Sequence, residues 1–241
     1  MKKLVVLLSI LAIVSGCRFW KGKKQSLPYS VLENKKAVED TAYYKVFKNF
    51  PEFISQEKKT KKNLTILNQA IVNFTDTLEQ YYWGTNPEGA KQIKNETQAA
   101  GIFELLNKYQ ILDTTHRFIS IKFETYSYAL GAHGFTGINT FNFDIKNNRF
   151  IQLTDIISFT KPENLIQLNN LVQKNFKNPD SCFNTQPAVS PDFNKFGISR
   201  EYLYLYYEAY ELGAYYCGSA TIKIPVNELK EYELWVLGNA W

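Results

Sequence analysis

The chain has 241 residues and a formal net charge of +5, with 45% apolar and 21% charged residues. This balance excludes global disorder, and the length suits one domain of about 200 residues behind an export signal. Residues 17–100 carry 14 basic against 9 acidic side chains, whereas residues 101–241 carry 12 against 14. A nucleic-acid-binding protein concentrates basic charge on its folded part, so nucleic acid is a poor candidate for the partner.

Residues 1–16 have the features of a secretory signal. Two lysines precede an apolar run over residues 4–14, which is broken by Ser9 and is shorter than the 20 or so residues needed to span a bilayer. The run ends in Val14-Ser15-Gly16-Cys17, which resembles the bacterial lipobox, where the cysteine is lipidated and becomes the mature N-terminus. An ordinary cleaved signal with an incidental cysteine is the alternative. We predict a lipoprotein held in the cell envelope through Cys17, and Arg18 rather than Asp after it favours the outer membrane in a cell that has one.

A basic tether is predicted over residues 17–30. The basic side chains of this region are Arg18, Lys21, Lys23, Lys24, Lys35 and Lys36. They can lie against anionic lipid, at about 1 kcal/mol per residue near the surface, or form a solvated linker. The domain itself is predicted to begin at Leu27-Pro28-Tyr29.

The smaller N-terminal half is assigned to residues 31–115. Residues 31–53 are mixed, with Pro51 breaking any helix. Apolar side chains then recur at three- and four-residue steps, which predicts an amphipathic helix ending near Tyr82. These side chains are Leu64, Leu67, Ile71, Phe74 and Leu78. Residues 88–109 are predicted to be partly helical.

The larger C-terminal half is assigned to residues 116–241. Alternating apolar residues predict a strand over Phe118–Tyr128, a partner strand around 141–145 and two further strands over Tyr202–Tyr207 and Ala220–Pro225, the last followed by a short helix. Thr160 and Glu163 read as a capping box that opens a helix. The fold class is therefore α+β, with helices packed on antiparallel sheet.

An ordered set of short motifs resembles a known family. The motifs are Ile119-Ser120-Ile121, Tyr-Ala-Leu-Gly-Ala-His-Gly at 128–134, Leu-Thr-Asp-Ile-Ile at 153–157 and the tyrosine-rich segment 196–230. They resemble the extracytoplasmic domain shared by RsiV-type anti-sigma factors and PdaC-type peptidoglycan deacetylases, and Phe50-Pro51-Glu52 with residues 67–71 resembles its N-terminal half. The resemblance implies an α+β fold and an envelope location. We find neither the transmembrane helix of the first group nor the metal-dependent catalytic domain of the second, so it implies an accessory or sensory module.

Few residues suit catalysis. The chain has two histidines, His116 and His133, so we expect no histidine-rich metal site and no cofactor. His133, between glycines, can bind a ligand, act as a base, or bond the backbone within a turn. Glu208 and Glu211, three residues apart, can form a carboxylate pair or be solvated loop residues.

Tyrosines are the better binding candidates. Tyr207, Tyr210, Tyr215 and Tyr216 can offer aromatic faces to a sugar or a partner protein, or can stack in the core. We assign a ligand-binding face to His133, Tyr210, Glu211 and Tyr215.

Two functions follow from these observations. The first is a non-catalytic envelope module that binds peptidoglycan, another glycan or a partner protein; the alternative is a hydrolase or deacetylase of wall glycan that uses His133 and an acidic residue. RsiV-type relatives bind lysozyme, so the resemblance implies lysozyme as one candidate partner. Lysozyme is basic, so its approach would need the acidic side chains between residues 201 and 233 to form a patch.

Cys182 and Cys217 remain after Cys17 is assigned to lipid. An even pair in an oxidising compartment predicts a disulfide between the proline-rich loop and the tyrosine-rich loop. Two buried free thiols are the alternative.

Overall fold

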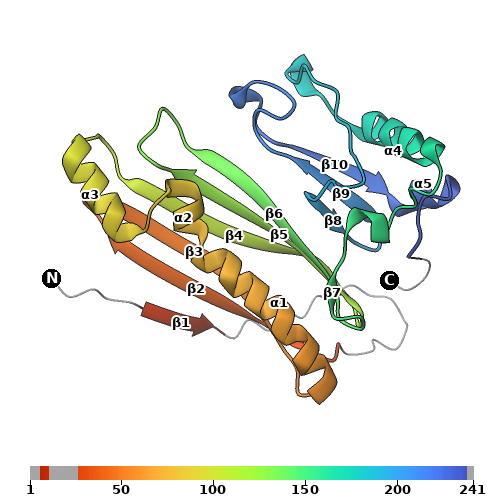
Figure 1. Ribbon diagram of the computed structural model, residues 1–241, viewed down its shortest axis with the longest axis horizontal. Coiled ribbons are helices and arrows are strands. Elements are labelled where there is room, and N and C mark those ends of the chain that lie inside the picture. Colours follow the sequence, from red (N-terminus) through yellow and green to blue (C-terminus); the bar gives the residue numbers. More distant parts are fainter. Residues whose placement is uncertain (1–5, 11–26, 238–241) are drawn as a thin grey trace. The chain divides into compact units, whose positions relative to one another are not determined.

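The computed structural model describes residues 6–10 and 27–237 (Figure 1). The chain divides into two compact units, which are described separately. Unit 1 comprises residues 1–109 and 124–135, and unit 2 comprises residues 110–123 and 136–241. Among the described residues, the strands form a seven-stranded sheet in the order β1-β2-β3-β4-β5-β6-β7 and a three-stranded sheet in the order β10-β9-β8. The predicted α+β class is confirmed.

The first four strands are β1 (Val6–Ile10), β2 (Ser30–Asp40), β3 (Tyr44–Ile54) and β4 (Phe103–Thr114). β1 falls within the predicted signal and pairs antiparallel with β2, whereas Cys17 lies outside the described residues. β2 and β3 form an antiparallel hairpin, and β3 runs parallel to β4 from Tyr44↔Phe103 to Lys48↔Asn107. Pro51 lies beyond that parallel stretch, so its missing N–H removes no bond to β4.

Lys35 and Lys36 are not part of the tether. Both lie in β2, where Lys35 pairs with Glu33 at 3.0 Å and Lys36 pairs with Asp76 at 2.8 Å. The domain begins before them, since Tyr29 is buried. The prediction that these two lysines extend a continuous basic tether was therefore wrong.

Three helices follow in unit 1: α1 (Lys58–Asp76), α2 (Leu78–Trp83) and α3 (Pro87–Thr97). α1 packs on β3 and buries Leu64, Leu67 and Ile71 (Figure 1). The single helix predicted to reach Tyr82 is two helices that are separated at Thr77, whose φ of −97° and ψ of −1° depart from regular helical geometry. α2 ends at Gly84, whose φ of 68° is the left-handed conformation that glycine adopts without strain. The helical part of residues 88–109 is α3.

Three strands continue the large sheet. They are β5 (Phe118–Tyr128), β6 (Phe135–Asp144) and β7 (Arg149–Phe150). The bounds of β5 are those predicted from its alternation. β6 pairs with β7 across Asn147-Asn148, and β6 starts six residues before the partner strand predicted around 141–145.

Unit 2 is completed by the remaining elements. They are η1 (Leu153–Asp155), α4 (Pro162–Asn175), η2 (Pro179–Ser181), β8 (Phe196–Ile198), β9 (Tyr202–Tyr207), η3 (Tyr215–Cys217), β10 (Ala220–Pro225) and α5 (Val226–Glu231). Strands β9 and β10 have the predicted bounds, and α4 and α5 pack on β10. The capping box at Thr160 was wrong: Lys161 occupies the N-cap of α4 without a side-chain bond, and Pro162 begins the helix.

Candidate functional site

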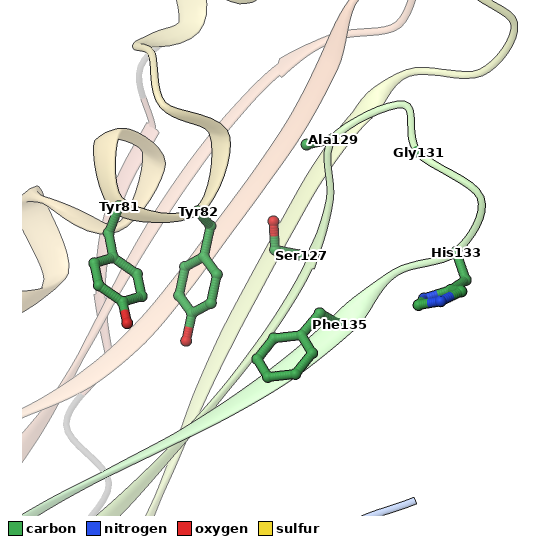
Figure 2. A pocket seen from close by; sticks show the side chains of 7 residues that line it. All are labelled: Tyr81, Tyr82, Ser127, Ala129, Gly131, His133 and Phe135. Atoms are coloured by element: carbon green, nitrogen blue, oxygen red, sulfur yellow. The ribbon is translucent and has the colours of Figure 1, made fainter. Parts of the chain in front are cut away.

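A pocket of about 390 Å³ lies in unit 1 and is lined largely by aromatic side chains. Its lining residues are Tyr81, Tyr82, Ser127, Ala129, Gly131, His133 and Phe135. The tyrosines come from α2, Phe135 from the start of β6, and the others from the end of β5 and the loop after it. In Figure 2 the ring of Phe135 lies between the two tyrosines and His133. The pocket therefore presents the rings of two tyrosines and a phenylalanine, together with the hydroxyl of Ser127 and the imidazole of His133.

The position of α2 sets where the tyrosine rings lie. Leu78 and Trp83 are buried at its two ends, and Trp83 Nε1 donates to the carbonyl of Glu104 at 3.2 Å. With those residues facing inward, Tyr81 is left 78% exposed. The rings of Tyr81 and Tyr82 meet edge to face, with centroids 4.9 Å apart. A largely exposed tyrosine beside a pocket contributes little to the core and is available to a ligand.

His133 lies on the exposed loop between β5 and β6. Its Nδ1 is 2.9 Å from the carbonyl oxygen of Gly134, so Nδ1 donates and, in the neutral ring, Nε2 carries the lone pair. A Cβ at residue 134 would overlap the ring of Tyr126, so glycine lets that ring pack directly against the backbone there. The bond from His133 to backbone is the one expected for a turn histidine, and the ring still lines the pocket.

The tyrosine-rich loop of unit 2 carries the other predicted site residues. The rings of Tyr210 and Tyr215 have centroids 5.5 Å apart, and Glu211 is exposed beside them. Tyr210 is 59% exposed with a φ of 75°, a strained conformation for a bulky residue. The structure thus brings Tyr210, Glu211 and Tyr215 together on one loop, while His133 belongs to unit 1.

Glu208 and Glu211 are held by Lys195. Its Nζ donates to Glu208 at 2.7 Å and to Glu211 at 2.8 Å. Glu208 also accepts from the N–H of Ile138 at 2.6 Å, and Glu211 from the N–H of Glu208 at 2.6 Å. Burial lowers the pKa of Lys195, but the two carboxylate bonds outweigh it and the net shift is upward. The two glutamates brace the loop instead of forming a free acid–base pair.

Tyr207 and Tyr216 have opposite environments. Tyr207 is buried, its hydroxyl donates to the carbonyl of Ala188 at 2.9 Å, and burial raises its pKa. Tyr216 is 83% exposed. Tyr207 is therefore a core residue, and Tyr216 is available at the surface.

Cys182 and Cys217 form the expected disulfide, with Cα atoms 5.7 Å apart. The bridge lies against Gly213, where an added Cβ would be 3.2 Å from the carbonyl oxygen of Cys182 and 3.4 Å from Sγ of Cys217. Lys195 and the disulfide thus hold the tyrosine-rich loop at both ends.

Neither a metal cluster nor a spanning helix is found in the described part of the chain. No group of three or more His, Cys, Asp or Glu side chains gathers there in a way that could hold a metal ion. Within the same residues, no helix is both long and apolar enough to cross a membrane.

Two family models match the chain in succession. Residues 37–136 match the family described as Deacetylase PdaC, and residues 158–227 match the family described as Protein of unknown function (DUF3298). The chain carries a PdaC/DUF3298-type extracytoplasmic domain. All seven lining residues of the pocket lie in the PdaC-type segment, and the tyrosine-rich loop lies in the DUF3298-type segment.

One curated relative and two solved structures support this assignment. The chain is 30% identical over 134 residues to the peptidoglycan-N-acetylmuramic acid deacetylase PdaC of Bacillus subtilis, a match that covers 53% of this chain and 29% of that enzyme. A DUF3298 family member from Bacteroides fragilis has a TM-score of 0.60 at 18% identity, with 85% of this chain and 92% of that chain covered. A second, from Pseudomonas aeruginosa, has a TM-score of 0.56 at 16% identity, with 89% and 97% covered. These two structures show a shared fold, and the match to PdaC spans less than a third of that enzyme's length.

Sequence reasoning missed Tyr81, Tyr82 and Phe135. The predicted helix ended near Tyr82, and neither Tyr81 nor Tyr82 was assigned a role. The break at Thr77 shifts the buried positions of α2 to Leu78 and Trp83, so Tyr81 faces outward. A run of three aromatic residues at the end of a predicted helix, where fewer can be buried, was the available signal.

Proposed function

We propose that this protein is a lipid-anchored, non-catalytic binding module for envelope glycan, and that the pocket formed by Tyr81, Tyr82, Phe135, Ser127 and His133 is its glycan site. The observation that carries the proposal is the position of the pocket: every lining residue belongs to the segment shared with a peptidoglycan deacetylase. Sugar rings present C–H faces that pack on aromatic rings, and their hydroxyl and acetamido groups need a few polar partners. The pocket offers both.

The composition of the lining supports binding over catalysis. Its seven residues include no carboxylate and no thiol, and the imidazole of His133 already bonds the backbone. Hydrolysis or deacetylation would need a positioned base together with a second acid, base or metal. The enzymatic alternative with His133 as base thus has no acidic partner in the pocket lining.

Titration with soluble peptidoglycan fragments tests the proposal. We expect saturable binding to the purified protein by calorimetry, and Tyr81→Ala to weaken it by about five- to thirtyfold through loss of about 1–2 kcal/mol of ring contact. Tyr216→Ala is the matched control, because Tyr216 is similarly exposed but lies in unit 2. Absence of binding at millimolar fragment would refute the glycan site. Acetate release that disappears in His133→Ala would instead show a deacetylase.

The lipid anchor is tested independently of the ligand. Mass spectrometry of the N-terminus of protein extracted from membranes should find an acylated Cys17 and no residues 1–16. An unmodified Cys17 would show an ordinary cleaved signal.

A protein partner at the tyrosine-rich loop is the second candidate function. It is supported by the strained, exposed Tyr210 on a loop that is fixed at both ends, an arrangement that pre-organises a contact. Lysozyme is the candidate from family resemblance, although Lys195 neutralises part of the acidic charge that a basic partner would need. Lysozyme binding that is lost in the Tyr210→Ala, Tyr215→Ala double variant would establish this face, and unchanged affinity would exclude it.

A further inference from the structure

The first turns of α1 carry four exposed lysines: Lys58, Lys59, Lys61 and Lys62, named the lysine quartet below. None of the four forms an ion pair with any residue in the described ranges. Other lysines of the same unit do: Lys36 pairs with Asp76, Lys48 with Glu79 and Lys91 with Asp40. The quartet is therefore a concentration of uncompensated positive charge.

This arrangement costs α1 stability. The N-terminal end of a helix carries partial positive charge, which favours acidic side chains, yet the first turn of α1 has no acidic residue. Lys58 and Lys62, and Lys59 and Lys62, are also at spacings where like charges on a helix repel. Glu57, just before the helix, is the one carboxylate between residues 55 and 62. Four lysines at a helix end that disfavours positive charge indicate that these side chains contact a partner outside the helix.

An apolar side chain continues the same face. Lys59, Lys62 and Ile66 follow at steps of three and four residues and so share one side of α1. Ile66 is 44% exposed, although Leu64 and Leu67 on either side are buried. Basic residues beside an exposed aliphatic side chain on a surface helix are typical of contact with a lipid interface.

Pro28 and Tyr29, where the predicted domain begins, are held near the start of α1. The hydroxyl of Ser55, three residues before Lys58, donates to the carbonyl of Pro28 at 2.5 Å, and the ring of Tyr29 packs edge-on against Phe53 with centroids 5.9 Å apart. Pro28 is eleven residue steps after Cys17, which limits the distance between them to about 40 Å. An anchor on Cys17 would thus hold this end of α1 within reach of the bilayer.

We propose that the lysine quartet and Ile66 form a membrane-contact surface that lies against anionic phospholipid. The location next to the bilayer rests on the proposed lipidation of Cys17, whereas the affinity for anionic lipid is a property of the quartet alone. α1 has 19 residues and is therefore about 28 Å long, and α2 with Tyr81 and Tyr82 follows its other end. Contact through the quartet would hold the aromatic pocket away from the lipid and toward the wall.

Vesicle co-sedimentation tests this surface without the acyl chains. Residues 18–241, the predicted mature chain without its lipidated cysteine, are mixed with vesicles of phosphatidylglycerol and phosphatidylcholine, or of phosphatidylcholine alone. We expect binding only to the anionic vesicles, and we expect Lys→Gln at all four quartet positions to weaken it at least about tenfold. The matched control replaces four exposed lysines elsewhere by Gln: Lys108, Lys146, Lys177 and Lys230. It lowers the net charge equally and should change the affinity by less than about threefold.

Three results would overturn the proposal. They are equal losses in the quartet and control variants, binding to neutral vesicles that equals binding to anionic ones, and no binding to either. Circular dichroism shows whether the quartet variant is folded, and Lys58→Gln with Lys59→Gln gives a milder variant that should lose affinity in proportion. Titration of the quartet variant with peptidoglycan fragments separates the two proposals, because the glycan pocket should be unaffected.

Discussion

Lys48 on β3 and Glu79 on α2 form an ion pair with Nζ and Oε2 2.5 Å apart, and their side chains are only 6% and 14% exposed. The same Nζ donates to the carbonyl of Thr75 at 2.5 Å, at the end of α1. One ammonium group therefore ties the last turn of α1 to the first turn of α2. Because α2 has only six residues, this pair acts together with buried Leu78 and Trp83 to hold Tyr81 and Tyr82 in place.

Removal of one partner of the Lys48–Glu79 ion pair should destabilise the folded protein. We expect Lys48→Met to lower the free energy of unfolding by about 3–5 kcal/mol, because it leaves the carboxylate of Glu79 buried without its cation. Urea denaturation measures the change. Lys36→Met is the control: it breaks an exposed pair with Asp76, whose side chains are 38% and 52% exposed, and should cost less than about 1 kcal/mol. Similar losses in both variants would show that burial of the pair contributes nothing.

The disulfide should contribute to stability in the oxidised protein. Cys182 and Cys217 are 35 residues apart, and closure of a loop of this length corresponds to about 4 kcal/mol on the chain-entropy model. We expect Cys182→Ser with Cys217→Ser to lower the free energy of unfolding by about 2–4 kcal/mol, measured in urea without reductant. Reductant should destabilise the parent protein by a similar amount and leave the double variant unchanged. Alkylation of both Cys182 and Cys217 in the denatured, non-reduced parent would contradict the bridge.

Local alternation was enough to predict several elements. β5, β9 and β10 have the predicted bounds because every second side chain in each is buried, and that period appears within a few residues of sequence. β2 and β4 were missed for a different reason. β2 has the polar sequence Ser-Val-Leu-Glu-Asn-Lys-Lys-Ala-Val-Glu-Asp, and β4 pairs with β3 from Tyr44↔Phe103, across three intervening helices. Such pairing is non-local and leaves no short-range period.

In the candidate sites, too, local features could be predicted from the sequence and non-local contacts could not. The glycines around His133 predicted a loop, and the tyrosine-rich segment placed Tyr210 near Tyr215, because both are sequence-local properties. Lys195 could not be predicted as the partner of Glu208 and Glu211, since it lies 13 and 16 residues away across a strand connection.

Tyr210 should prefer glycine to alanine. Its φ of 75° strains every residue with a Cβ, and both substitutions remove the same ring contact with Tyr215. We therefore expect Tyr210→Gly to be more stable than Tyr210→Ala by about 1 kcal/mol in urea denaturation. At Tyr215, which begins η3, the usual order should hold and alanine should be more stable. If alanine is more stable at both positions, Tyr210 is not strained.

Asp155 should make stability depend on acid pH. Its carboxylate accepts from Arg149 at 2.7 Å and from the N–H of Gln152 at 2.7 Å. The bond with Arg149 is the largest cause of its lowered pKa, and burial partly opposes it. A group whose pKa is lower in the folded state stabilises the protein above its unfolded pKa, ordinarily 3.8, and the contribution disappears as pH falls through the folded value.

Asp155→Asn should therefore be less stable than the parent at pH 7, by about 1 kcal/mol because the pair is partly exposed. The difference in stability between the two proteins should begin to shrink as the pH falls below about 4, and should shrink further as the pH falls through the lowered folded pKa of Asp155, provided the protein is still folded there. Urea denaturation of both proteins at several pH values measures it. In an Arg149→Met background the same substitution should show a smaller pH-dependent gap, because the charge that lowers the pKa of Asp155 is absent. A gap that stays constant from pH 7 to the acid limit would show that the carboxylate charge of Asp155 contributes nothing, and that its role is limited to neutral hydrogen bonds at the start of η1.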